Sequence, residues 1–200
     1  MSSNQLIPAQ EMARAVDLPQ ADASSLVDRE VLEAQIKDMY RQVARDEEPE
    51  LHFEVGRPLA LRVGYPTELL DAIPAEALSS FAGVGYHLDL AVLNLSPVKH
   101  RVFAETARVL RPGGRLAIAD IVSGRPLKER TRRNVELWAA CIAGAIPRNS
   151  YRETIEAAGF RVGEVRTNNY TFISERALDA CSTYGVESIS LAAVKEPPQS

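Results

Sequence analysis

Apolar residues in the first part of the chain recur with helical spacing. Between residues 29 and 44 they fall on one helical face, and Asp28 stands just before them as a candidate N-cap. Thr67 and Pro74 are placed to open two further short helices, the second running through Ser80. The face of the first helix consists of Leu32, Ile36, Met39, Tyr40 and Val43. The pattern therefore predicts a helical region over residues 28–85.

From Ser96 onward helices and strands alternate. Ser96-Pro97 is typical of a helix start, and "RPGG" is typical of a tight turn before a buried apolar strand. Ser150 and Glu153 have the spacing of a capping box, and Gly185 is placed to end the last helix. After the first helix, the pattern predicts helices over 129–145, 150–159 and 174–184, and strands over 115–122, 160–167 and 186–194.

This alternation predicts an α/β fold with helices on both faces of a sheet. The last two strands are expected to pair antiparallel, as a mixed edge. The chain divides into a flexible polar tail at 1–27, the helical region at 28–85, an α/β region at 86–195 and a disordered tail at 196–200.

Composition and charge exclude several classes of partner. The 200 residues are 46% hydrophobic and 25% charged, with a net charge of −4, as in an ordinary soluble domain. Acids interleave with the basic residues, which disfavours nucleic acid or an anionic membrane as partner. The two cysteines, Cys141 and Cys181, and the three histidines have no metal-ligand spacing, so no metal is expected. Without a leader or a long apolar run, we expect a cytoplasmic protein with free thiols.

One late segment, "VFAETARVLRPGGRLAIADIV", is similar to the helix, turn and fifth strand of class I S-adenosylmethionine-dependent methyltransferases. Further segments occur in order on both sides: "LHFEVGRPLALRVGYP", "SFAGVGYHLDLA", "VLNLSPVKHRVFAE", "ELWAACIAGAI" and "ALDACSTYGVESISLAAV". Together they resemble the arsenite methyltransferase family and its relatives over about residues 28–195. The resemblance implies a Rossmann-like fold.

The chain departs from this family at one junction. In the family, "FAGVGY…DLA" is followed by a strand, a glycine-rich cofactor loop, and a second strand ending in an acid that holds the ribose. Here Ala91 runs directly into Val92, and no G-x-G lies between a strand and a helix. At about thirty residues per βαβ unit, the absent portion is on the order of a hundred residues. We therefore expect a truncated Rossmann-like fold that uses no cofactor.

The junction itself has the pattern of a strand. In an extended "HLDLAVLNL" (87–95), apolar residues point to both faces, as in a strand covered on both sides. This segment is expected to replace the lost fourth strand beside residues 115–122, giving a sheet of about four strands. Its new edge must be paired or covered. Pairing predicts a homodimer through the sheet edge, and cover by the N-terminal helices is the alternative.

Three residues are candidates for catalysis. Tyr86 and His87 enter the junction, where the resembling family has a loop that reaches the substrate pocket. A histidine is suited to acid–base chemistry, although His87 also fits a plain surface or strand-start position. Asp120 ends "RLAIAD", and open α/β sheets bind ligands at the carboxyl ends of their strands.

Three further residues are candidates for substrate binding. Asn94 matches the family's loop next to the transferred methyl, and also fits a backbone cap. Trp138 suits an aromatic pocket wall or, equally, core packing. Cys141 matches a family position where a cysteine helps to bind trivalent arsenic, but it also fits a small buried hydrophobe. Val84 and Ala91 occupy the regions of the family's other cysteines, and a single thiolate holds a soft metalloid poorly.

These features favour three functions. The first is binding of a small molecule, or its cofactor-independent cyclisation, isomerisation or elimination, in a reused substrate pocket. The second is a non-catalytic role as the partner of a complete methyltransferase, bound through a sheet edge. The third is methyl transfer with a rebuilt cofactor site, which the missing glycine loop and ribose acid disfavour.

Overall fold

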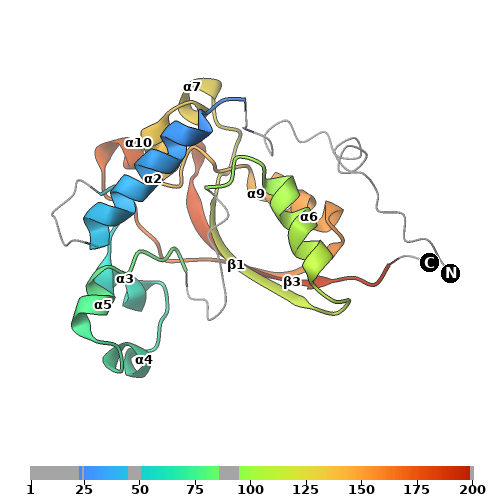
Figure 1. Cartoon of the computed structure of the whole chain (residues 1–200), viewed down its shortest axis with the longest axis horizontal. Coiled ribbons are helices and arrows are strands. Elements are labelled where there is room, and N and C mark those ends of the chain that lie inside the picture. Colours follow the sequence, from blue (N-terminus) through green and yellow to red (C-terminus); the bar gives the residue numbers. More distant parts are fainter. Residues whose placement is uncertain (1–22, 24, 45–50, 86–94, 199–200) are drawn as a thin grey trace.

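The computed structural model describes residues 23, 25–44, 51–85 and 95–198. Its centre is a sheet of three strands, β1 (Arg115–Val122), β2 (Phe160–Thr167) and β3 (Glu187–Lys195). β3 lies in the middle and pairs antiparallel with both neighbours, and Figure 1 shows it beside β1. The α/β class and the antiparallel pairing of the last two strands are confirmed. The predicted fourth strand lies outside the described residues except for Leu95.

Five helices of the second half surround this sheet. They are α6 (Lys99–Val109), α7 (Glu129–Arg132), α8 (Val135–Ala139), α9 (Arg148–Ala157) and α10 (Glu175–Tyr184). The last helix follows the prediction, because the Ser174 side chain caps it and Gly185 ends it with a φ of 63°. Glycine suits this helix end, because it adopts the left-handed conformation without steric cost.

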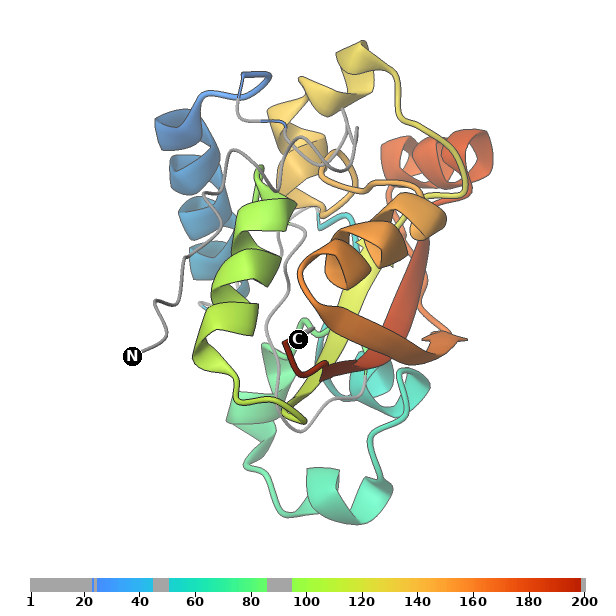
Figure 2. The ribbon, with the colours of Figure 1, turned by 90° about the vertical axis from the view of Figure 1, so that its right-hand side faces the viewer.

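Alternate side chains of β1 reach two different apolar clusters. Leu116 and Ile118 on one face join Phe103 of α6 and Tyr151 of α9. Figure 2 shows α6 and α9 together on one side of the sheet. Ile121 on the opposite face packs with residues of α8 and α10. Cover on both faces explains why "RLAIADIV" is apolar almost throughout.

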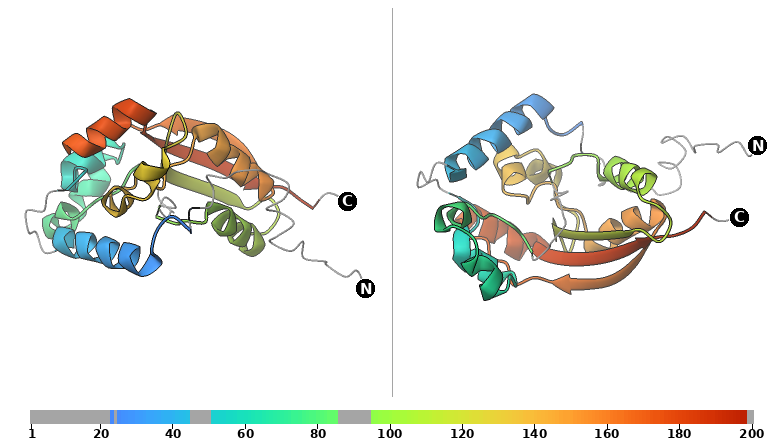
Figure 3. Two further views of the ribbon diagram at one scale, coloured as in Figure 1. Left: turned by 90° about the horizontal axis from the view of Figure 1, so that it is seen from above. Right: turned by 60° about the horizontal axis from the view of Figure 1, so that its bottom comes forward.

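Four helices lie in the described part of the N-terminal region, residues 25–44 and 51–85. They are α2 (Arg29–Ala44), α3 (Gly56–Arg62), α4 (Thr67–Asp71) and α5 (Ala75–Ser79). Asp28 caps α2 as predicted, because its Oδ1 accepts hydrogen bonds from the backbone N–H groups of Glu30 and Val31. α2 packs beside α8, as Figure 3 shows from two directions. Ala23 is already buried, and its N–H donates to the carbonyl of Pro97, so packed chain begins before the predicted boundary at residue 28.

Three helix boundaries differ from the prediction. The single helix expected over 129–145 is wrong, because the Asn134 side chain accepts a hydrogen bond from the Leu137 N–H and starts α8 as a separate helix. The capping box at Ser150 is also wrong, since α9 already begins at Arg148 after Pro147. α6 begins two residues beyond Pro97, after Val98. Helix α3 was not predicted at all.

Candidate functional site

Asp120 is fully buried near the carboxyl end of β1. Its side chain lies on the α9 side of the sheet, where the Tyr151 hydroxyl donates a hydrogen bond of 2.7 Å to Asp120 Oδ2. The backbone N–H of Ile121 donates to Oδ1 at 2.9 Å. Burial and the neighbouring Asp120 raise the pKa of Tyr151 well above its ordinary value, so the phenol keeps the proton that it donates. The two residues form a buried donor–acceptor pair.

Lys99, which the sequence analysis did not select, lies in the same region. It is the first residue of α6 and only 2% exposed. Its ammonium donates to the Ser96 carbonyl at 3.3 Å and lies 6.0 Å from the centre of the Trp138 ring. Burial lowers the pKa of Lys99 to about 8, although the charge of Asp120 acts in the opposite direction. A buried amine and a buried carboxylate are thus electrostatically coupled.

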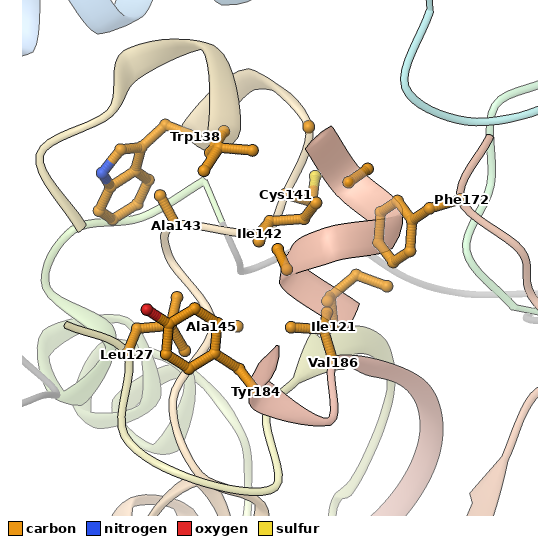
Figure 4. Packing of buried hydrophobic residues seen from close by; sticks show 14 of the residues in the cluster. Ile121, Leu127, Trp138, Cys141, Ile142, Ala143, Ala145, Phe172, Tyr184 and Val186 are labelled. Carbon is orange, nitrogen blue, oxygen red and sulfur yellow. The ribbon is translucent and has the colours of Figure 1, made fainter. Parts of the chain in front are cut away.

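Trp138 lies in α8 and Cys141 follows this helix, and both are buried. The Trp138 ring is 1% exposed, and its Nε1–H donates to the Arg132 carbonyl at 2.7 Å. Figure 4 shows Trp138 and Cys141 among the apolar side chains of the core, with Ile142 between them. Burial, and then the charge of Asp120, raise the pKa of Cys141 to about 12, so its thiol is protonated at neutral pH. Trp138 is therefore a core residue, and core packing was one of the two roles that its aromatic ring allowed.

Cys141 has an unusual backbone for its residue type. Its φ is 61°, and it is the one non-glycine residue of the described chain in the left-handed region. Its N–H donates to the Trp138 carbonyl, and the N–H of Ile142 donates to that of Leu137. These two bonds form the helix-ending motif in which glycine normally occupies the left-handed position. A buried thiol is retained here at a cost in backbone energy, and such strain is concentrated at functional sites.

Replacing Cys141 by glycine is expected to give a more stable protein than replacing it by alanine, by about 1 kcal/mol. Both changes remove the thiol, but only glycine removes the strain of the left-handed backbone. Urea unfolding of the two variants measures the difference. The matched control is Ala139→Gly inside α8, which should cost about 0.5–1 kcal/mol. An alanine variant at position 141 as stable as the glycine variant would contradict the strain.

The structure thus brings three of the six predicted site residues together. Asp120 accepts a hydrogen bond from Tyr151, its charge acts on Lys99 and Cys141, and Lys99 lies 6.0 Å from the centre of the Trp138 ring. We call these five residues the central cluster. The other three predicted residues, Tyr86, His87 and Asn94, lie outside the described residues.

A signal for both additional residues was present in the sequence. Lys99 stands four residues before Phe103, on the apolar face of the predicted helix. Tyr151 stands four residues before Ile155, and both side chains are fully buried. A lysine on an apolar helical face is rarely buried without a partner, which was the sign that could have selected Lys99.

The described residues do not offer the glycine loop that S-adenosylmethionine requires in this fold. The one G-x-G spacing is "GVG" at 83–85, which follows α5 rather than a strand. Its central carbonyl, that of Val84, accepts hydrogen bonds from Ser188 Oγ at 2.5 Å and Asn168 Nδ2 at 3.2 Å. A Cβ on Gly83 would meet the ring of Phe81 at 2.5 Å. Gly83 thus packs against Phe81, and the Val84 carbonyl is bound by the chain itself, so this G-x-G does not have the place of a cofactor loop after a strand.

Metal ligands do not gather in the part of the chain that the structure describes, since no group of three His, Cys, Asp or Glu side chains could hold an ion there. Cys141 and Cys181, both within the described residues, form no disulfide, as predicted, and burial raises the pKa of Cys181 to about 11. None of the described helices combines the length and the hydropathy that crossing a membrane demands.

Comparison with known proteins agrees with the resemblance seen in the sequence. The chain is 38% identical over 86 residues to the arsenite methyltransferase of Halobacterium salinarum, which covers 42% of this chain and 22% of that protein. It is 32% identical over 88 residues to the Homo sapiens arsenite methyltransferase, covering 44% and 24% respectively. The matched part thus spans about a quarter or less of the length of these relatives.

A solved structure and a family model extend the comparison. The crystal structure of CrArsM, an arsenic(III) S-adenosylmethionine methyltransferase from Chlamydomonas reinhardtii, is 28% identical, with a TM-score of 0.42 over 54% of this chain and 36% of that chain. A family model described as a methyltransferase domain matches residues 21–159, which is well over half of the chain. The chain therefore belongs to the methyltransferase domain family and resembles its arsenite methyltransferases.

Proposed function

We propose that this chain is a methyltransferase-family protein that does not bind S-adenosylmethionine and that binds a small molecule at the central cluster, where it carries out a cofactor-independent reaction. The loss of the cofactor is argued from the junction between Ala91 and Val92, where the strand, glycine loop and ribose acid of the family have no counterpart. The one G-x-G of the described residues supports this view, because a Cβ on Gly83 would meet the ring of Phe81 and the Val84 carbonyl accepts a hydrogen bond from Ser188.

The observation that carries the proposal is that Lys99 and Asp120 are both buried and that the charge of Asp120 acts on Lys99. Each is at most 2% exposed, and placing charged groups in a protein interior costs several kcal/mol even when they are paired. An apolar pair of the same volume would stabilise the fold at least as well. Perturbed titratable groups of this kind gather at functional sites, and Asp120 lies near the carboxyl end of its strand.

The cluster has the groups that cyclisation, isomerisation or elimination needs. Asp120 accepts a proton as a carboxylate, and the Tyr151 hydroxyl holds it in one orientation. The Lys99 amine titrates near neutral pH and can therefore both donate and accept a proton. Tyr86 and His87 are further proposed acid–base groups, and Asn94 is a proposed substrate ligand, on the resemblance alone. Such a site acts by positioning and proton transfer.

Calorimetric titration of the purified protein with S-adenosylmethionine, and with its demethylated product S-adenosylhomocysteine, tests the loss of the cofactor. We expect no heat of binding at sub-millimolar concentrations of either compound. A complete methyltransferase of the same family is the positive control. Binding with unit stoichiometry would overturn the proposal and restore methyl transfer with a rebuilt cofactor site as the first reading.

A second candidate function is that of a non-catalytic partner, either of a second copy or of a complete methyltransferase. The supporting observation is that β1, among the described strands, pairs on one side only. An open strand edge is a surface on which another chain can add a strand. Light scattering after size-exclusion chromatography measures the mass in solution. A monomer at all concentrations would exclude the homodimer through the sheet edge.

A further inference from the structure

A cavity of about 250 Å³ lies between α9 and the strands β2 and β3. Its floor is apolar and comes from the two strands, whereas its wall is polar and comes from the helix. The six described lining residues are Val165 of β2, Ile189 and Leu191 of β3, and Arg148, Asn149 and Arg152 of α9. None of these six belongs to the central cluster, so the cavity is separate from the site of the proposed function.

A β-bulge places Val165 in the floor of this cavity. Where β2 pairs with β3, two residues of β2, Gly163 and Glu164, face a single residue of β3. Val162 points to the α9 side of the sheet, so strict alternation would place Glu164 on this side and turn Val165 away. The extra residue instead brings Val165 to the α9 side, where it packs partly buried against the same apolar cluster. Bulges re-aim side chains in this way and are concentrated next to functional sites.

The two arginines of the wall are oriented by ion pairs and keep donors for a further acceptor. Arg148 Nη1 lies 3.2 Å from Glu187 Oε1, and Arg152 Nε lies 2.9 Å from Glu156 Oε1. Each guanidinium has five N–H donors, so one such contact does not use them all. The side chains of Arg148 and Arg152 are 40% and 53% exposed, and ion pairs at such positions are weak enough for a ligand to share or replace. The backbone N–H of Arg148 also donates to the Ser123 carbonyl at 2.9 Å, which fixes the start of α9 to the end of β1.

We propose that this cavity binds a small aliphatic monocarboxylate. Guanidinium groups recognise a carboxylate by paired hydrogen bonds, and the branched apolar side chains of the floor suit a short alkyl chain. Glu187 and Glu156 balance the formal charge of the two arginines, which disfavours a dianion such as a phosphate ester. The volume is below the range of about 300–1,000 Å³ that holds drug-sized ligands, so the ligand has on the order of ten non-hydrogen atoms.

Titration of the isotope-labelled full chain with hexanoate, followed by NMR, tests this site. We expect saturable shifts of the backbone amides of Val165, Ile189 and Leu191, with a Kd on the order of 1 mM. Acetate has the charge without the chain, and 1-hexanol has the chain without the charge, so each should bind at least about fivefold more weakly than hexanoate. Equal binding of either compound, shifts confined to other residues, or no saturation by about 20 mM hexanoate would overturn the proposal.

Three variants tie the binding of hexanoate to the cavity. Arg152→Met keeps an aliphatic stem on the exposed side of α9 but removes the charge, and should weaken binding at least about fivefold. Arg161→Met is the matched control, because Arg161 is an exposed residue of β2 that pairs with Glu196 outside the cavity, and it should leave the Kd within about twofold. Val165→Phe fills the floor and should abolish saturable binding.

Circular dichroism shows whether each of these variants is folded. Folded Arg152→Met that binds hexanoate as the wild type does would overturn the recognition of a carboxylate by the wall. Folded Val165→Phe that still binds would place hexanoate outside the cavity. The binding of S-adenosylmethionine does not enter this test, because the cavity lies apart from the central cluster.

Discussion

Replacing Asp120 by alanine is expected to lower the free energy of unfolding by about 3–5 kcal/mol. The carboxylate is fully buried, and its removal leaves the Tyr151 hydroxyl without the acceptor seen at 2.7 Å. The Lys99 ammonium, which is also buried, loses the largest of the charges that favour it. Both groups then stay in the interior without this partner, which costs more than the lost contact itself. Urea unfolding at pH 7 measures the change.

Two matched variants show which part of this cost is electrostatic. Tyr151→Phe removes the donor and leaves the charges in place, so we expect about 1.5–3 kcal/mol, the usual cost of a hydrogen bond to a charged group. Asp120→Asn keeps the volume and an acceptor but removes the charge. Its loss in free energy of unfolding should lie between the losses of Asp120→Ala and Tyr151→Phe. The double variant at 120 and 151 should cost less than the sum of the single changes, because they share one interaction. An alanine variant that loses under about 1 kcal/mol would contradict a coupled cluster.

The sequence predicted the members of this cluster unevenly, for a physical reason. Asp120 was found because a charged residue at the end of an apolar run must be either buried with partners or functional. Cys141 was found through the family resemblance, and Trp138 because an aromatic ring suits a pocket wall or a core. Lys99 and Tyr151 were missed because a place on an apolar helical face indicates burial but does not show which groups of other elements lie against the side chain. Their burial depends on β1, which lies sixteen or more residues away along the chain.

The fold shows the same division between local and tertiary control. Strand β1 and helix α10 match the prediction, because a continuous apolar run and a Ser–Gly pair of caps are local signals. The segment over 129–145 was predicted as one helix, since its composition is helical throughout. In the structure the Asn134 side chain and the left-handed Cys141 interrupt it, so that Trp138 and Cys141 reach the core around β1. In this segment tertiary packing outweighs the local helix propensity.

The largest pH-dependent effect should come from Lys99. Below pH 8 the residue is protonated in both the folded and the unfolded state, so its burial carries a constant cost. Between about pH 8 and 10.5 the folded state has lost this proton while the unfolded state still binds it. Stability then rises with pH by about 1.4 kcal/mol per pH unit, because the unfolded state binds more protons. The whole contribution is on the order of 3 kcal/mol.

Other groups change stability in the opposite direction over part of this range. The pKa of Cys141 is raised to about 12 and that of Cys181 to about 11, so their unfolded thiols lose protons before the folded ones do. Their stabilisation falls as pH rises above about 9. The effect of Lys99 is therefore read from the difference between the wild type and Lys99→Met, measured by urea unfolding from pH 7 to 10.

In that difference Cys181 cancels, but Cys141 does not, because the charge of Lys99 lowers its pKa. The slopes are therefore compared below about pH 9, before the unfolded thiols lose their protons, and there the wild type should gain stability relative to Lys99→Met as pH rises above 8. Removing Lys99 also changes the free energy of unfolding at every pH, because Asp120 loses a cationic neighbour. The test is therefore the slope of this free energy against pH and not its absolute value. Lys195→Met is the matched control for removing a partly buried lysine, since its ammonium donates to carbonyls at the end of α6. Parallel curves for the wild type and Lys99→Met would mean that the amine is not desolvated in the folded protein. The proton-transfer role proposed for Lys99 would then lose its physical basis, whereas the absence of a cofactor loop would stand.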